Sequence, residues 1–245
     1  MSIRTDYYKH IRIGWKMALF VIGDLHLSFG SDKPMEVFGA HWDAHYDKIK
    51  ADWLEKVTEN DTVIIPGDIS WAITFEGAKV DLTWIDGLPG KKIIFKGNHD
   101  YWWVSRAKMD KVFQSIDFVH NTFATYGDIA ICGTRGWICP GDAFTDDDDK
   151  IYKRELIRLE NSILQAIKAG YTRIYGVLHF PPTNEKKETS GFTEIFQKYA
   201  ITQVVYGHVH AKSNFKNAIK GNFHGVNYWL TSCDYLDFKL IQLPE

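Results

Sequence analysis

Five short apolar runs along the chain each end directly in polar side chains that can bind a metal or transfer a proton. The runs cover residues 19–23, 63–67, 93–97, 174–178 and 204–207, and the side chains that follow them are Asp24, His26, Asp68, Asn98, His99, His179, His208 and His210. Apolar runs of this length are typical of buried strands. Because ligands of open α/β sheets gather at the carboxyl ends of the strands, we expect these side chains to meet at one sheet edge.

The segments between and after these runs carry helical and further strand patterns. Apolar residues three or four apart predict helices at about 42–57, 75–86, 102–113, 146–169 and 192–199, and strand-like runs occur at 116–120, 128–133, 213–215, 222–232 and 237–243. The runs at 116–120 and 128–133 suggest a second sheet. The three C-terminal runs are separated by turns without helices, which predicts a partly antiparallel meander. Four aspartates, 146–149, are expected in a helical first turn, where carboxylates meet the positive end of the helix dipole.

Length and composition indicate one large α/β domain. The 245 residues are 45% hydrophobic and 15% aromatic, which is enough for a substantial core. Charge is nearly balanced, with 29 Lys and Arg against 31 Asp and Glu, and this argues against a nucleic-acid partner. The three cysteines are odd in number and lack a zinc-ligand spacing, so we expect buried thiols in a reducing compartment.

The N-terminal segment carries no motif. No apolar run reaches the roughly 20 residues that cross a membrane, and a cleaved signal peptide would remove Asp24 and His26. We therefore expect a cytoplasmic protein without a membrane partner. Residues 1–16 precede the first strand and are expected to be a dispensable extension of a domain that covers residues 17–245. The oligomeric state is open at this stage.

Two carboxylates, one amide and four imidazoles form the candidate ligand set, which is Asp24, His26, Asp68, Asn98, His179, His208 and His210. Nitrogen and oxygen donors without a thiolate favour Mn, Fe or Zn, with Ni or Co as further options, over a structural cysteine–zinc site. The set is too large for one ion and suits two that share a carboxylate. Two such ions would outweigh the charges of Asp24 and Asp68 and attract a phosphate group. Paired ions can also activate water for an in-line displacement.

His99 is the histidine left over. It adjoins Asn98, but neighbouring side chains should diverge, and an imidazole beside the metals could protonate a leaving alkoxide. The alternative is a core histidine that donates to a carbonyl.

The ordered motifs resemble those of the calcineurin-like metallophosphoesterase family, in its small, uncapped bacterial form. They are Asp24-x-His26, Gly67-Asp68, Gly97-Asn98-His99-Asp100, His179 and Gly207-His208-x-His210. The resemblance implies a two-sheet β-sandwich flanked by helices, with a two-metal centre at the strand ends. It implies that Asp24, His26, Asp68 and His210 hold one metal, and that Asp68, Asn98, His179 and His208 hold the other. A water shared by the metals would be the nucleophile, and His99 would assist the leaving group.

One departure from the family pattern concerns the residues after Gly67-Asp68. Residues 69–72 lack the Asp and Arg of the Ser/Thr protein phosphatase branch, which argues against protein phosphatase activity. The only carboxylate left near His99 is Asp100, a poor candidate because adjacent side chains rarely bond usefully. Arg135 could reach a phosphate, although its loop position favours a surface arginine. Four tryptophans near the motifs could stack on a nucleobase or aryl group, or pack in the core; they are Trp71, Trp102, Trp103 and Trp137.

These observations predict a metal-dependent hydrolase of a small phosphomonoester or phosphodiester. One alternative is a nuclease of the same fold, which the absence of a basic surplus disfavours. Another is a non-catalytic metal-binding scaffold. A protein that had lost its activity would be expected to lack one of the ligand residues or His99. This sequence has all of them, which disfavours the scaffold.

Overall fold

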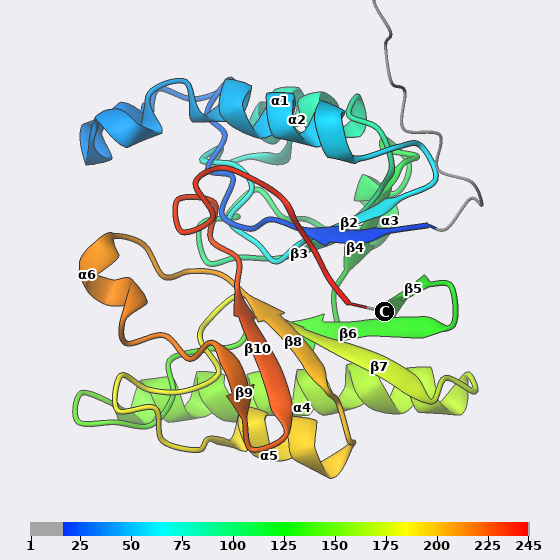
Figure 1. Ribbon diagram of the computed structural model, residues 1–245, viewed down its shortest axis with the longest axis vertical. Helices are drawn as coiled ribbons and strands as arrows, with labels where there is room; N and C mark the ends of the chain where they lie inside the picture. Colours follow the sequence, from blue (N-terminus) through cyan, green and yellow to red (C-terminus); the bar gives the residue numbers. More distant parts are fainter. Residues whose placement is uncertain (1–16, 245) are drawn as a thin grey trace, which may run out of the picture.

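The computed structural model describes residues 17–244, and two sheets packed face to face form its centre (Figure 1). The first sheet has the order β11-β1-β2-β3-β4, with β1 Leu19–Val21, β2 Thr62–Ile65, β3 Lys91–Phe95, β4 Ile116–Val119 and β11 Ile241–Gln242. The second has the order β5-β6-β7-β8-β10-β9, with β5 Phe123–Tyr126, β6 Ile129–Thr134, β7 Arg173–Leu178, β8 Gln203–Tyr206, β9 Gly221–Phe223 and β10 Val226–Leu230. Strands β1 to β4 are parallel, as are β6, β7, β8 and β10, so their carboxyl ends reach the same edge.

Helices cover both outer faces of the sandwich. Helices α1 His45–Lys56 and α2 Phe75–Asp86 lie over the first sheet, and α4 Asp146–Lys168 and α5 Gly191–Lys198 lie over the second (Figure 1). Successive residues of a strand point to opposite faces. Val21 therefore packs between the sheets, while Phe20 and Ile22 pack toward the helices of the first layer. Because both faces are buried, the strands read as continuous apolar runs. The predicted two-sheet α/β sandwich is confirmed.

The helix after Thr145 begins as its acidic run predicts. Thr145 accepts a hydrogen bond from the Asp148 N–H and Asp148 bonds back to Thr145, which forms a capping box. The four aspartates occupy the first turn, where the helix dipole favours negative charge. The buried face of α4 then packs against β6.

Several predicted elements differ in the structure. The pattern at 102–113 gives only α3 Arg106–Met109, because Trp102 is buried and donates its indole N–H to Asp100 at 3.0 Å. Residues 213–215 lie in a helix, α6 Lys212–Phe215, and 222–232 forms the hairpin of β9 and β10. The strand at 116–120 joins the first sheet, not the second.

The prediction of a C-terminal meander is also wrong, although the antiparallel pairs β9–β10 and β1–β11 do occur. Strand β10 pairs parallel to β8, and β11 leaves this sheet to pair antiparallel with β1. The chain between β1 and α1 folds into two short helices, η1 Met35–Phe38 and η2 Ala40–Trp42. Over residues 17–244, none of the helices combines the length and apolar character needed to cross a membrane. The expected extension, residues 1–16, lies outside the described residues.

Candidate metal centre

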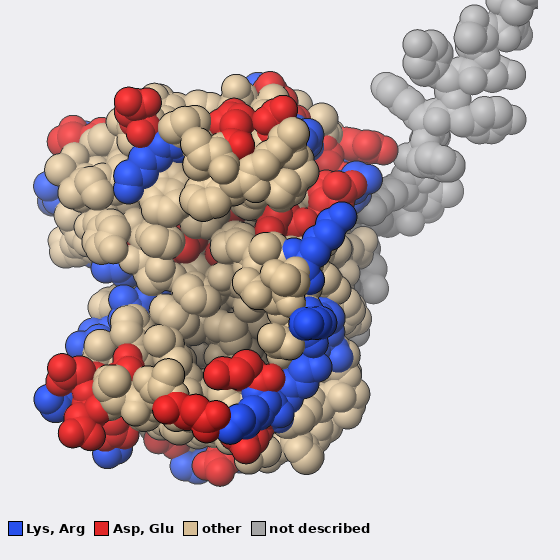
Figure 2. Space-filling view, turned by 90° about the vertical axis from the view of Figure 1, so that its left-hand side faces the viewer, with Lys and Arg blue, Asp and Glu red and all other residues tan. Residues whose placement is uncertain are grey.

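The strand ends bring the seven candidate ligands together at one edge of the sandwich. They are Asp24 and His26 after β1, Asp68 after β2, Asn98 after β3, His179 after β7, and His208 and His210 after β8. Figure 2 looks onto the side of the molecule where these strands end and shows it hollowed between an upper and a lower half. Asp24, Asp68 and His179 are buried almost completely.

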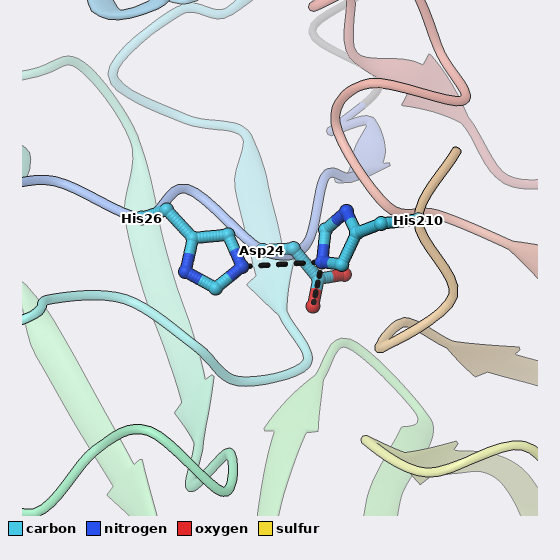
Figure 3. A group of neighbouring side chains, drawn as sticks. All are labelled: Asp24, His26 and His210. Carbon is cyan, nitrogen blue, oxygen red and sulfur yellow. Dashed lines mark hydrogen bonds and ion pairs between the residues drawn. The ribbon is translucent and has the colours of Figure 1, made fainter. Parts of the chain in front are cut away.

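The first group of donors consists of Asp24, His26 and His210 (Figure 3). Their donor atoms lie within 4.8 Å of one another. The Nε2 atoms of His26 and His210 are 3.1 Å apart, and His210 Nε2 is 3.6 Å from Asp24 Oδ1. Such a spacing suits two nitrogens that bind one ion at about 2.0–2.1 Å.

The second group consists of Asp68, His179 and His208, with Asn98 beside them. Asn98 Oδ1 lies 2.7 Å from His179 Nε2 and 2.8 Å from His208 Nδ1. The two imidazole nitrogens are 3.2 Å apart, and His179 Nε2 is 3.4 Å from Asp68 Oδ2. Four nitrogen and oxygen donors thus converge on one point.

Asp68 lies between the two groups. Its Oδ2 is 3.9 Å from His26 Nε2 in the first group and 3.4 Å from His179 Nε2 in the second. Asp24 Oδ1 of the first group is 3.8 Å from His179 Nδ1 of the second. Each of the two carboxylates, Asp24 and Asp68, therefore lies close to a histidine of the other group. The donor set fits two transition-metal ions that share Asp68. The individual ligand roles stay a prediction.

The backbone at these ligands is strained. Asp24, His26, Asp68 and His208 have positive φ angles of 56°, 45°, 52° and 69°. Non-glycine residues rarely adopt this conformation, and where it occurs it is often part of a functional site. The glycine before Asn98 is required for a different reason, because a Cβ on Gly97 would collide with the Asp68 carboxylate. At four of the seven candidate ligands, the backbone therefore holds a conformation that non-glycine residues rarely adopt.

Two carboxylates that the sequence did not assign hold the ligands in place. Asp234 Oδ1 accepts a hydrogen bond from His210 Nδ1 at 2.9 Å and so fixes the ring. Asp100 does not orient His99. It accepts hydrogen bonds from the backbone N–H groups of Gly97, Asp68, Ile69 and Ser70 and from the Trp102 indole, and so fixes the loop that carries Asp68. The sequence feature that could have indicated Asp234 is its position shortly after the strand-like run at 222–232, where the other candidate ligands also follow strands.

Burial keeps most of the imidazoles neutral, which is the form that binds metal. Desolvation lowers the pKa of His179 to about 3 and that of His208 to about 4, and it lowers the pKa of His26 well below its usual value. His210 differs. Burial lowers its pKa, but Asp234 and Asp24 raise it to about 10, because the ring lies between two carboxylates. A bound cation would take the place of that proton.

His99 stays apart from both groups. Its ring packs against Trp71 with centroids 4.4 Å apart and lies 5.9 Å from the His26 ring. Within residues 17–244 its ring nitrogens make no hydrogen bond, and its backbone N–H donates to Asp68 Oδ1 at 2.8 Å. The structure therefore does not support the alternative interpretation of His99 as a core histidine that donates to a carbonyl.

Arg135 is half-buried, so the expectation of a surface arginine is wrong. Its guanidinium lies over the Trp137 ring at 4.7 Å and 4.0 Å from the buried Glu155. Its carbonyl accepts the His179 N–H at 3.0 Å. Among the other tryptophans, Trp102 is in the core, Trp103 packs against it, and Trp71 stacks on His26 with centroids 4.9 Å apart.

Two pockets open at the candidate centre. The aromatic pocket, about 280 Å³, is walled by Met35, Phe38, Trp42 and Trp71 and reaches His26, His99 and His210. The amide pocket, about 250 Å³, is walled by Phe180, Asn184, Glu185, Asn214 and Asn217 and reaches His208. Each donor group therefore has its own opening to solvent.

A two-sheet sandwich flanked by helices, with two groups of imidazole and carboxylate donors at the carboxyl ends of its parallel strands, is the architecture of a candidate metal-binding α/β protein. A family model described as calcineurin-like phosphoesterase matches residues 17–212, and the chain belongs to this family. The resemblance seen in the motifs is confirmed. No curated protein matches the chain.

Solved structures share the fold at low sequence identity. Phosphopantetheinyl hydrolase from Mycobacterium tuberculosis is 14% identical, with 95% of this chain and 98% of that chain covered and a TM-score of 0.56. A protein from Thermus thermophilus is 12% identical, with coverage of 93% and 98% and a TM-score of 0.55. A protein of unknown function from Aquifex aeolicus is 17% identical, with coverage of 93% and 96% and a TM-score of 0.50. At these identities the similarity concerns the fold alone.

Proposed function

We propose that this protein is a two-metal phosphohydrolase that cleaves a small phosphate ester. The observation that carries the proposal is the pair of donor groups that meet at Asp68, with distances of 3.4 and 3.9 Å from its Oδ2 to one imidazole of each group. Membership in the calcineurin-like phosphoesterase family supports the reaction class. Mn, Fe or Zn are the metals that best match these donors.

Each group has a distinct place in the proposed centre. Asp24, His26 and His210 would hold one ion, Asn98, His179 and His208 the other, and Asp68 both. Bound ions would supply Lewis acidity toward the phosphate and an activated water. Asp234 keeps His210 in the orientation that turns Nε2 toward the centre, and Asp100 keeps the Asp68 loop in its strained form.

His99 is the proposed proton donor to the leaving oxygen. Its ring lines the aromatic pocket beside His26 and His210 without belonging to either donor group. No carboxylate of the described residues bonds the ring. Its position instead depends on the Trp71 ring, on which it packs.

Metal removal tests the reaction class. Purified protein is treated with a chelator, and the hydrolysis of p-nitrophenyl phosphate and of bis(p-nitrophenyl) phosphate is measured before and after Mn²⁺ is returned. We expect chelation to abolish hydrolysis and Mn²⁺ to restore it. Full activity in metal-stripped protein, or no hydrolysis of any phosphate ester after two ions are bound, would contradict the proposal. The second outcome would favour a binding scaffold.

Replacement of His99 tests the proton donor. His99→Asn should keep both metals and lower turnover by about 10²–10⁴, the usual size of general acid assistance. The loss should be smaller for an aryl phosphate than for an alkyl phosphate, because an aryl leaving group needs less protonation. His120→Asn is the matched control, since His120 is exposed and lies outside the donor groups. Loss of metal in His99→Asn, or equal slowing of both esters, would show that the assigned role is wrong.

A further inference from the structure

The two pockets lie at the two ends of one centre. The aromatic pocket reaches His26 and His210 of the first donor group, and the amide pocket reaches His208 of the second. The groups themselves are in contact through Asp68. A phosphate held between them would therefore have a pocket on each side. A phosphomonoester has one arm to place, and a phosphodiester has two.

The aromatic pocket suits a planar, apolar arm. Its volume of about 280 Å³ exceeds the roughly 150 Å³ of a cavity that accommodates benzene. The Lys33 ammonium lies 4.8 Å from the centre of the Trp71 ring, a cation–π contact on one wall of this pocket. Phe38 lines the pocket and is 63% exposed, so this aromatic side chain has an uncovered face.

The amide pocket combines apolar walls, which include Ile138, Phe180 and Val209, with amide and carboxylate side chains, and so suits an arm that carries hydroxyl groups on a carbon skeleton. In the part of the chain that the structure describes, the Asn217 amide and the Glu185 carboxylate make no hydrogen bond or ion pair. The Asn184 amide differs, since it already donates to the Pro140 carbonyl at 2.8 Å and to Glu188 at 2.6 Å. Asn217 and Glu185 thus offer a donor and acceptors to a ligand, while Phe180 packs on His208 with centroids 4.1 Å apart.

His99 distinguishes the two sides, because it lines the aromatic pocket and not the amide pocket. We propose that the substrate is a phosphodiester with a planar apolar arm in the aromatic pocket and a hydroxyl-bearing arm in the amide pocket, and that the planar arm leaves. This inference rests on the proposed function. The P–O bond to the planar arm breaks, a water oxygen forms the new P–O bond, and the departing oxygen takes a proton from His99. The attacking water gives its proton to the medium, His99 takes one back from the medium, and the products are the planar alcohol and the monoester of the polar arm.

Two nitrophenyl esters with Mn²⁺-loaded protein test the inference. Glyceryl p-nitrophenyl phosphate fills both pockets, and p-nitrophenyl phosphate fills only the aromatic one. We expect kcat/KM to be at least tenfold higher for the diester. Because nitrophenolate is the better leaving group in either orientation, the direction of cleavage is tested with benzyl glyceryl phosphate, whose two alcohols leave similarly well, and the expected products are benzyl alcohol and glycerol phosphate. Asn217→Ala should lower kcat/KM about 2- to 10-fold for the diester, the usual effect of one lost hydrogen bond, and leave the monoester unchanged. Phe38→Ala should weaken both substrates, and its exposed neighbour variant Val37→Ala neither.

Binding is measured separately from turnover in the Mn²⁺-loaded protein, by the quenching of tryptophan fluorescence in a stopped-flow experiment before hydrolysis proceeds. Asn217→Ala should weaken the diester only, and Phe38→Ala both. Equal kcat/KM for the two esters, or glycerol as the released alcohol, would overturn the inference and leave the proposed function standing. An Asn217→Ala protein that binds the diester as tightly as the parent would also overturn it. Absence of hydrolysis with both esters, despite bound metal, would overturn the proposed function as well.

Discussion

The two donor groups of the candidate centre lie side by side but are held by different parts of the molecule. In the first group, His210 is 31% exposed and takes its orientation from one side chain, Asp234, on the segment after β10. In the second, His179 is fully buried, and its Nδ1 is 3.1 Å from the Pro66 carbonyl while its N–H bonds to the Arg135 carbonyl. The orientation of His210 in the first group thus depends on the Asp234 side chain, which can be replaced by mutation. The orientation of His179 in the second depends on backbone carbonyl groups, which cannot. Substitutions should therefore affect the groups unequally.

Asp68→Asn should produce the largest effect, because Asp68 contacts both donor groups and is the ligand proposed to be shared by the two metals. An amide cannot neutralise two cations, so we expect fewer than two metals per chain. Turnover on aryl and alkyl esters should fall alike, by about 10²–10⁴ or more. Metal per chain and rates on both esters are the measurements. Asp43→Asn, at an exposed position, is the control. Two tightly bound metals in Asp68→Asn would show that Asp68 does not join the groups.

Asp100→Asn should weaken the main-chain support of the second group. One oxygen that accepts N–H donors becomes an NH₂ group that faces them, and a buried network of this kind is costly to break. We expect the free energy of unfolding to fall by about 2–5 kcal/mol, as measured by urea titration. Asp117→Asn, half-buried on β4 with a surface ion pair to Lys91, should change it by less than about 1 kcal/mol. Similar losses in both variants would mean that Asp100 does not hold the Asp68 loop.

Asp234→Asn should act on the first group alone. Loss of a carboxylate behind a metal-binding histidine typically costs 10- to 100-fold in metal affinity or activity. We expect one of two metals to bind about 10- to 100-fold more weakly, while the other and the fold are unchanged. Isothermal titration with Mn²⁺ gives both affinities, and Asp237→Asn on the exposed turn nearby is the control. Equal loss of metal affinity at both sites would contradict the inference that Asp234 supports only the first group.

Thr145→Ala should have the smallest effect and mark the baseline away from the centre. It removes the capping box of α4, which lies on the far face of the second sheet, and should cost about 1 kcal/mol of unfolding free energy. Exposed Thr172→Ala should be close to neutral. Hydrolysis and metal content should match the parent in both. A change in either would mean that α4 is coupled to the centre.

The elements that the sequence predicted well are those with local causes. Helix α2 matches the expected 75–86, and α4 begins at its acidic run, because helical spacing, capping and dipole effects act within a few residues. The three cysteines are buried and unpaired, as their number and spacing predicted. The edge where the ligands meet was also predictable, since parallel strands share one carboxyl end.

Partner choice was decided by tertiary structure. The runs at 213–215 and 222–232 could not reveal that one would be helical, or that β10 would pair with β8. An apolar strand pattern shows which faces are buried and does not name the neighbouring strand. Asp234 was missed, and Asp100 was considered only as a partner of His99, for a related reason. Asp234 meets His210 across 24 residues, and Asp100 meets Asp68 across 32, so their roles exist only once the loops are folded together.

The sequence by itself determined the candidate ligand set, its order along the chain and the family, because strand ends in a parallel sheet place chemically matched residues at one edge. The tertiary structure alone decided how the set divides into two groups joined at Asp68. It also placed His99 against Trp71 and a different pocket at each end of the centre. The strand ends also carry left-handed backbone at Asp24, His26, Asp68 and His208. Only the packed protein holds that backbone, since local preference in the sequence opposes it.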